Sequence, residues 1–205
     1  MIPVAPLTLL TFIPAGLALN LTPGADMMFC LGQGLSQGRR AAMAANFGIA
    51  LGGMIHVTVA GLGLGALVAT QPVAFDVIRW AGVAYLLYLA VKTWRAGPVS
   101  AGAVGAQNVF RRALMVNLLN PKVILFILAF LPQFVDPSRA VLPQFLTLGL
   151  VFTVGGLMVN GAVGLMAGSI GKGLTRSPRL SAWLNRTCAT IFTGLALRLA
   201  LIQAR

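Results

Sequence analysis

Two charged side chains stand inside long apolar stretches of this sequence, and each follows a proline closely. Asp26 comes three residues after Pro23, and Lys122 comes directly after Pro121. A charge is expensive to bury in apolar surroundings, so it commonly pairs with an opposite charge or serves a polar ligand or a proton. These two residues are therefore the first candidates for chemistry in this chain.

The prolines bring a second kind of polar group into the same stretches. Proline removes a backbone donor and clashes with the preceding turn, and Gly24 tolerates the geometry that results. A helix that restarts after such a break presents unpaired amide groups, which favour an anion. Groups of both signs suit a zwitterion such as an amino acid, with its α-ammonium bound by Asp26. Lys122 or a restarted helix would then bind its α-carboxylate.

The predicted site for substrate binding or coupling combines the two charges with the residues of the breaks. It consists of Pro23, Gly24, Asp26, Asn120, Pro121 and Lys122. A simpler interpretation remains open, in which Asp26 and Lys122 only neutralise each other, or Lys122 extends to a membrane interface.

Besides Asn120, three further polar residues are candidates for lining the same cavity: Asn20, Asn117 and His56. The asparagines, Asn20, Asn117 and Asn120, either contribute to it or only bond carbonyl groups freed by the breaks. His56 is the single histidine. It could relay protons, but we favour a packed position with a hydrogen bond across helices.

The composition indicates an all-α integral membrane protein. Hydrophobic residues make up 58% of the 205 residues and charged residues only 9%, against roughly 25% charged residues in soluble domains. Long apolar runs without period-2 alternation favour helices over a barrel. About 20 apolar residues are needed for each crossing. Six transmembrane segments are predicted, at about 5–36, 41–70, 74–94, 113–132, 143–168 and 185–203.

The basic residues predict the orientation in the inner (plasma) membrane. Ten of the 15 lie in or at the edges of the connections after the first, third and fifth segments: Arg39, Arg40, Lys92, Arg95, Arg111, Arg112, Lys172, Arg176, Arg179 and Arg186. The positive-inside rule places these connections in the cytoplasm and both termini outside. The same residues suit anionic lipid headgroups. Because no nucleic-acid motif accompanies them, the net charge of +12 does not indicate a nucleic-acid partner.

The chain is predicted to be one transporter domain, residues 1–205, with an internal repeat. A first half of about 1–96 and a second half of about 109–205 flank a cytoplasmic linker at about 97–108. Three features recur in order: Asn20–Pro23 with Asn117–Pro121, Gly52–Gly53 with Gly155–Gly156, and Gly82–Ala84 with Gly194–Ala196. Since each half has three segments, the two halves would be inverted relative to each other.

Two of these motifs resemble signatures of the lysine-exporter (LysE/RhtB) family of amino-acid exporters. Thr22–Asp26 is similar to its Pro-Gly-Pro-Asp signature, although Ala25 replaces the second proline, and Asn120–Lys122 is similar to its Asn-Pro-Lys signature. The resemblance covers essentially the whole chain. It implies a six-helix exporter coupled to the proton motive force, with a homodimer as a candidate assembly.

Other functions fit the residues less well. A transmembrane thiol redox protein needs two apposed reactive thiols, but Cys30 and Cys188 have no CxxC spacing. A cation exporter of related architecture needs several oxygen ligands, and Asp26 is the only acid within an apolar segment. A membrane scaffold would not need Asp26 at all. No enzyme motif, metal site or cofactor is predicted. Neutral substrates such as threonine, homoserine or leucine are favoured over lysine and arginine, because a second cationic group would lack a partner.

The predicted topology can be tested with reporter proteins fused after Arg205 and in the connections. We expect an externally active reporter to work at Arg205 and a cytoplasmic reporter to work next to Arg40. A cytoplasmic reporter that is active at Arg205 would contradict the six-segment topology and favour an odd number of spans.

Overall fold

The computed structural model describes residues 3–70, 108–167 and 178–201, together with positions 77, 80, 83, 84, 87, 88, 90–92, 94 and 95 between them. All regular elements bounded within these residues are helical. In chain order they are α1 (Pro6–Leu21), α2 (Ala25–Gln37), α3 (Arg39–Thr70), α5 (Val109–Leu118), α6 (Pro121–Leu125), the π-helix η1 (Phe126–Phe130), the 3₁₀-helix η2 (Leu131–Phe134), α7 (Val141–Leu165) and α9 (Pro178–Leu201).

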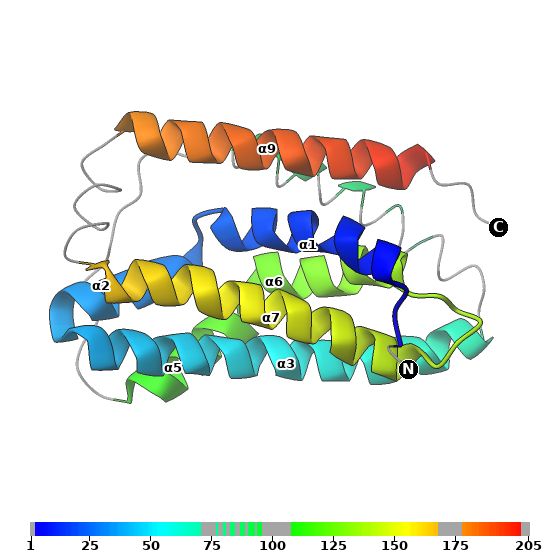
Figure 1. The fold of residues 1–205 in the computed structure, drawn as a ribbon, viewed down its shortest axis with the longest axis horizontal. Coiled ribbons are helices and arrows are strands. Elements are labelled where there is room, and N and C mark those ends of the chain that lie inside the picture. The colour runs from blue at the N-terminus through cyan, green and yellow to red at the C-terminus, as the bar shows by residue number, and fades with distance from the viewer. Residues whose placement is uncertain are drawn as a thin grey trace.

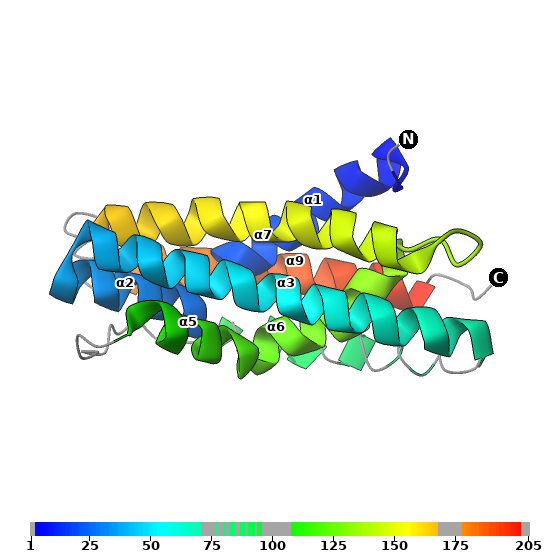
Figure 2. The same ribbon diagram turned by 90° about the horizontal axis from the view of Figure 1, so that it is seen from below.

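The helices lie side by side along one long axis (Figures 1 and 2). At the centre, α3 packs against α7, α5 and α2, while α1 packs against α7 and α9. The beginnings of α3, α5 and α9 lie at one end of the bundle, and those of α1 and α7 lie at the other (Figure 1). Arginines lie within the first turn of α3, α5 and α9. Their positive charge therefore gathers at one end of the bundle, which is consistent with the predicted topology. Which end faces the cytoplasm stays a prediction.

Two candidate membrane spans lie within the described residues, or four if each of two bent helix pairs counts as one span. Two are straight helices of 25 residues, Arg39–Gly63 and Val141–Leu165. The other two are pairs of shorter helices, each bent at a break. These four correspond to the predicted segments at about 5–36, 41–70, 113–132 and 143–168. The segment predicted at about 74–94 lies largely outside the described residues, and α9 begins seven residues before the predicted start of the last segment. The number of six stays a prediction.

Both predicted breaks are present. The axes of α1 and α2 differ by 53° across Thr22–Gly24, so Ala25 in place of a second proline does not remove the first break. The axis changes by 48° between α5 and the segment that begins at Pro121. Pro23 and Pro121 stand at these two breaks, where their missing amides do not interrupt the hydrogen bonds of an existing helix.

Glycines allow the helices to approach closely. A methyl group on Gly48 of α3 would overlap with the carbonyl oxygen of Phe110 in α5. One on Gly61 would lie 2.9 Å from Phe145, and one on Gly164 would lie 2.9 Å from Ala42. These contacts bring α3 close to both α5 and α7. The small residues therefore serve packing within the chain.

Gly48→Ala should destabilise the protein, because the backbone of Phe110 cannot move aside as a flexible side chain could. Overpacking of this kind costs about 1–3 kcal/mol. Gly63→Ala in the same helix is the matched control, since nothing lies within 4 Å of the added methyl group. Melting temperatures of the purified proteins in detergent test this. Equal melting temperatures for the two variants would contradict the proposed contact.

Candidate functional site

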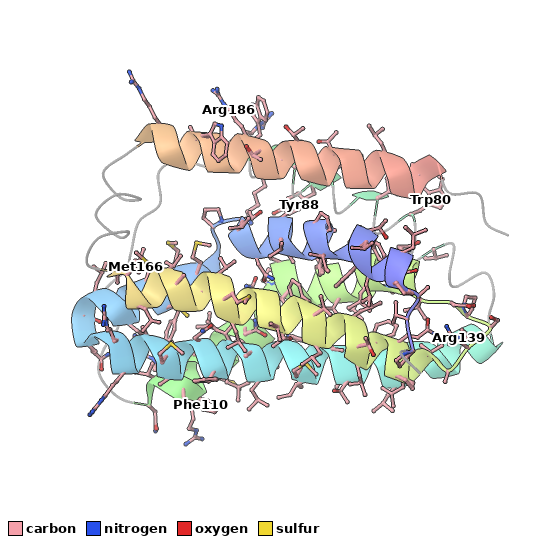
Figure 3. The ribbon with its side chains drawn as sticks, in the orientation of Figure 1. Trp80, Tyr88, Phe110, Arg139, Met166 and Arg186 are labelled. Carbon is pink, nitrogen blue, oxygen red and sulfur yellow. The ribbon has the colours of Figure 1, made fainter. Side chains whose placement is uncertain are left out.

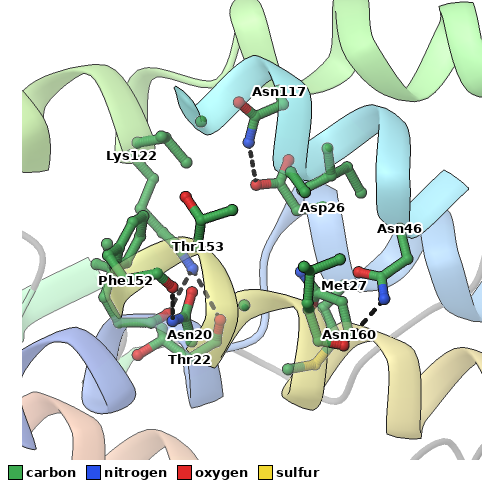
Figure 4. A pocket seen from close by; sticks show the side chains of 17 residues that line it. Asn20, Thr22, Asp26, Met27, Asn46, Asn117, Lys122, Phe152, Thr153 and Asn160 are labelled. Atoms are coloured by element: carbon green, nitrogen blue, oxygen red, sulfur yellow. Dashed lines mark hydrogen bonds between the residues drawn. The ribbon is translucent and has the colours of Figure 1, made fainter. Parts of the chain in front are cut away.

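A small cavity lies between the two breaks and the middle of the long helices (Figure 4). Its free volume is about 30 Å³, enough for about two water molecules but too small for an amino acid. The polar residues that line it are Asn20, Thr22, Asp26, Asn46, Asn117, Lys122, Thr153 and Asn160. They lie far apart in the sequence, between positions 20 and 160, so folding brings them together. The structure therefore represents a closed conformation of this cavity.

Asp26 contributes its carboxylate from the first turn of α2. Its Oδ2 accepts a hydrogen bond of 2.8 Å from Nδ2 of Asn117 in α5. Its Oδ1 is buried and has no hydrogen-bond partner among the described residues. One oxygen thus fixes the carboxylate, and the other is left for a donor that enters the cavity.

Three other buried oxygens of the cavity lack a hydrogen bond within the described part of the chain. They are Oδ1 of Asn46, Oδ1 of Asn117 and Oγ1 of Thr153. The orientation of Asn46 follows from its Nδ2, which donates to the carbonyl of Leu157 at 2.9 Å. Buried polar atoms without partners are rare and usually indicate an absent water, ion or ligand. Because most of these atoms are acceptors, the site fits a ligand with several N–H donors.

Lys122 connects the second break to the first. Its Nζ donates to the carbonyl oxygens of Leu19 at 3.0 Å and Thr22 at 2.8 Å, at the end of α1. Carbonyls at a helix C-terminus lack partners within the helix, and a lysine there stabilises them. Gly24 makes room for this ammonium, because a methyl group at that position would lie 3.1 Å from it.

The two restarted helices differ in their availability to an anion. Oδ1 of Asn120 accepts a hydrogen bond of 3.1 Å from the amide of Lys122, which caps α6. The cap residue of α2 is Gly24, and no side chain caps that helix. Asn120 and the prolines are not among the cavity lining. The helix N-terminus that remains open beside Lys122 and Asp26 is therefore that of α2.

Two further predicted candidates occupy packed positions. Asn20 lines the cavity, and its Nδ2 donates to the carbonyl of Phe152 at 3.0 Å. Nε2 of His56 lies 3.3 Å from the carbonyl oxygen of Asn117, and His56 itself is not part of the lining. This contact joins two helices, as the packed position predicted for His56 requires. The role of His56 stays a prediction.

Sequence reasoning missed Asn46, Thr153 and Asn160, which line the cavity from the two long helices. A signal for the last two exists in their spacing of seven residues, which places both on one face of an α-helix. Polar residues on one face of an otherwise apolar helix are expected to face a cavity or another helix.

Metal and thiol chemistry gain no support from the described residues. Within them, no three His, Cys, Asp or Glu side chains are grouped as metal ligands. Cys30 is a buried free cysteine in α2. The side chain of Cys188 lies outside the described residues, so the predicted lack of a thiol pair stays a prediction.

The bent helix pairs, the two partly buried charges and the polar cavity between them are features of a helical membrane protein. Its relatives agree with this class. The family model described as LysE type translocator matches residues 17–203. The chain therefore belongs to the LysE type translocator family.

Several relatives match nearly the full length of the chain. A protein of Vibrio cholerae serotype O1 named "Uncharacterized membrane protein" is 34% identical over 95% of this chain and 97% of its own. The homoserine/homoserine lactone efflux protein of Salmonella typhi is 33% identical over 85% and 86%. The leucine efflux protein of Klebsiella pneumoniae subsp. pneumoniae is 31% identical over 97% of both chains. No solved structure matches this chain.

Lys122→Met should lower the melting temperature, because the carbonyl groups of Leu19 and Thr22 lose their donor. An unsatisfied buried polar group costs about 1–3 kcal/mol. Lys92→Met, which removes the same charge from an exposed position, is the matched control and should change stability little. An unaltered melting temperature in Lys122→Met would show that these hydrogen bonds do not stabilise the first break.

Proposed function

We propose that this protein exports neutral amino acids across the inner membrane by using the cavity around Asp26. The observation that carries the proposal is the group of buried acceptor oxygens without partners beside an intramembrane carboxylate. The efflux of homoserine and leucine by relatives, as their names state, agrees with it. In the conformation described, the cavity is closed and must widen to admit a substrate.

The α-ammonium group would bind to Oδ1 of Asp26 together with Oδ1 of Asn46 and Oδ1 of Asn117. An ammonium has three donors and no acceptor, so three acceptor oxygens, one of them charged, suit it. Asn117 would hold the carboxylate of Asp26 in place through Oδ2. This arrangement explains why an acid and two asparagines share one apolar region.

The α-carboxylate would bind between the N-terminus of α2 and the ammonium of Lys122. The unpaired amides in the first turn of α2 favour an anion, and Gly24 brings Lys122 next to that turn. Lys122 would contribute mainly its charge, because its Nζ already donates to two carbonyl oxygens.

The substrate side chain would contact the apolar part of the lining. Met27, Ile49 and Leu157 surround the cavity next to its polar residues. A second cationic group on the substrate would find no further carboxylate among the described lining residues. These contacts favour substrates such as leucine, homoserine or threonine over lysine and arginine.

The single carboxylate supports coupling to the proton motive force. An ammonium and a proton cannot both occupy Asp26, because each uses its negative charge. Release of the amino acid on the outer side would free Asp26 for a proton, which would then be carried inward. The resulting exchange would export one zwitterion for each proton that enters.

An inverted repeat would allow the site to open to either side. Contacts between the halves support it: Asn20 of the first half packs on Gly155 and Gly156 of the second, while Asn117 of the second packs on Gly52 of the first. These residues correspond in the two predicted repeats, so exchanging the halves exchanges the contacts. A rocking motion of such halves gives alternating access.

A cation exporter is the second candidate, because the same acceptor oxygens would also suit a hard cation. The two functions differ in their need for a carboxylate-binding group. An exported cation needs neither Lys122 nor the open N-terminus of α2, and a positive charge close to the site would weaken its binding.

Asp26→Asn should reduce amino-acid export by about tenfold or more, because a charged hydrogen bond contributes about 1.5–3 kcal/mol. Efflux of homoserine, leucine and lysine from loaded cells, divided by the amount of protein in the membrane, measures this. Asp76→Asn is the control variant. Export of divalent cations without export of any amino acid would instead support the cation exporter.

The double variant Asp26→Asn/Lys122→Gln separates substrate binding from simple charge neutralisation. If the two residues only neutralised each other, each single change would leave an uncompensated charge and the double variant would recover export. We expect no recovery. Full activity in Asp26→Asn, or restored activity in the double variant, would remove Asp26 from the substrate site.

A further inference from the structure

A second cavity lies at the end of the bundle opposite the arginine-rich helix starts. Its free volume is about 290 Å³, and it is open to the surroundings. It is bordered by the start of α1, by η2 and by the connection to α7, the region of Arg139 (Figure 3). Its polar lining consists of Thr8, Thr11, Gln133, Asp136, Arg139 and Gln144. We call this space the outer vestibule.

A buried side chain fixes the loop that carries the two charges of the outer vestibule. Gln144 is only 2% exposed. Its Oε1 accepts from the amide of Asp136 at 2.8 Å, and its Nε2 donates to the carbonyls of Asp136 at 2.9 Å and Ala140 at 3.0 Å. A loop residue held through both its amide and its carbonyl has a defined position, although its side chain is exposed.

Asp136 and Arg139 present opposite charges to the same space without pairing. Oδ1 of Asp136 accepts from the amide and the hydroxyl of Ser138, at 2.9 and 2.6 Å. Within the described loop, Oδ2 of Asp136 and the guanidinium of Arg139 have no hydrogen bond or ion pair with each other. The hydrogen bonds from Ser138, with a smaller effect of Arg139, lower the pKa of Asp136, so its carboxylate stays charged in mildly acidic surroundings.

Five phenylalanines separate the outer vestibule from the central cavity. Phe152 lines the central cavity and Phe134 lines the vestibule. Ring contacts connect them: Phe152 and Phe126 have centroids 5.0 Å apart, Phe126 and Phe130 5.0 Å, Phe130 and Phe134 5.0 Å, and Phe12 lies 5.2 Å from Phe134. We call these residues the phenylalanine barrier. Its rings form a continuous apolar chain from one cavity to the other, so neither charged end of an amino acid would find a polar partner among them.

We propose that the outer vestibule is a second, low-affinity binding site for a zwitterionic amino acid, which receives the substrate after it has passed the phenylalanine barrier. Asp136 would bind the ammonium and Arg139 the carboxylate, so the amino acid would lie between two charges that the protein leaves unpaired. This inference rests on the proposed function, because the central cavity must first supply the amino acid.

The exposure of the site is consistent with a role in release. Charged groups in contact with water bind their partners weakly, because water competes for the same hydrogen bonds. A tight site at the exit would retain the product and slow the next cycle. A weak site would instead stabilise both charged ends while the barrier closes behind them, and would make export sensitive to high external concentrations of the same amino acid.

The test uses right-side-out membrane vesicles that are loaded with labelled L-leucine or L-homoserine. Efflux is measured while the same unlabelled amino acid is added outside, which gives the external concentration that halves the rate. Vesicles without the protein give the background. We expect Asp136→Asn and Arg139→Gln each to raise the half-inhibitory concentration about fivefold to tenfold, since each loses one charged contact.

Two analogues of leucine identify which charged group of the amino acid each residue binds. N-acetyl-L-leucine lacks the ammonium, and L-leucinamide lacks the carboxylate. The unaltered protein should be inhibited more strongly by leucine than by either analogue. Asp136→Asn should lose only the discrimination against N-acetyl-L-leucine, and Arg139→Gln only that against L-leucinamide. Arg139→Lys, which keeps the charge, should retain most of the inhibition by leucine.

Arg179→Gln is the matched control, because it removes the same charge at the opposite end of the bundle and should leave external inhibition unchanged. If Arg179→Gln raised the half-inhibitory concentration as much as the vestibule variants do, the effect would be one of net surface charge, and the proposal would be overturned. Unchanged inhibition in both vestibule variants, with normal efflux and membrane abundance, would overturn it as well. If unaltered vesicles release neither amino acid above background, the proposed function itself fails, which is a distinct result.

Discussion

Backbone groups in a membrane must find hydrogen-bond partners within the protein, and this constraint governs how the first helix is interrupted. The break after α1 leaves carbonyls at its end without partners in the helix, and lipid chains offer no hydrogen-bond donors to replace them. Lys122 supplies the missing donors to Leu19 and Thr22 from a segment 100 residues later in the chain. A local defect in one half is therefore stabilised only after the other half has folded onto it.

The same requirement places the second break against the first half. Asn117, just before that break, donates to Asp26, and His56 of α3 lies against its carbonyl oxygen. Each break is thus completed by residues of the opposite half. The polar centre is held by hydrogen bonds across helices, and the glycine contacts described above allow the backbones to approach closely enough to form them. Removing one partner would leave several polar groups unsatisfied together.

Much of this polar centre could be predicted from the sequence, because a proline followed closely by a charged residue in an apolar segment indicates a break in the helix. Pro23 and Pro121 gave the two breaks, and Asp26 stood out as an acid in an apolar segment. The direction in which the Lys122 side chain points could not be predicted, since its partners are backbone carbonyls that come within reach only in the folded bundle. Asn46 of α3 was missed for a related reason: its position facing the cavity depends on how α3 rotates against α7.

The π-helix η1 holds one more residue in its turn than an α-helix would, and it directly precedes η2. Extra residues of this kind occur often at functional sites. Returning this turn to α-helical geometry would rotate the following segment by roughly 100° and shift it along its axis by about 1.5 Å. Phe130 and Phe134 lie in and after this turn, so a single change of helical register would remove two of the five rings from their stack. If the phenylalanine barrier opens as proposed, η1 gives that movement a step of fixed size.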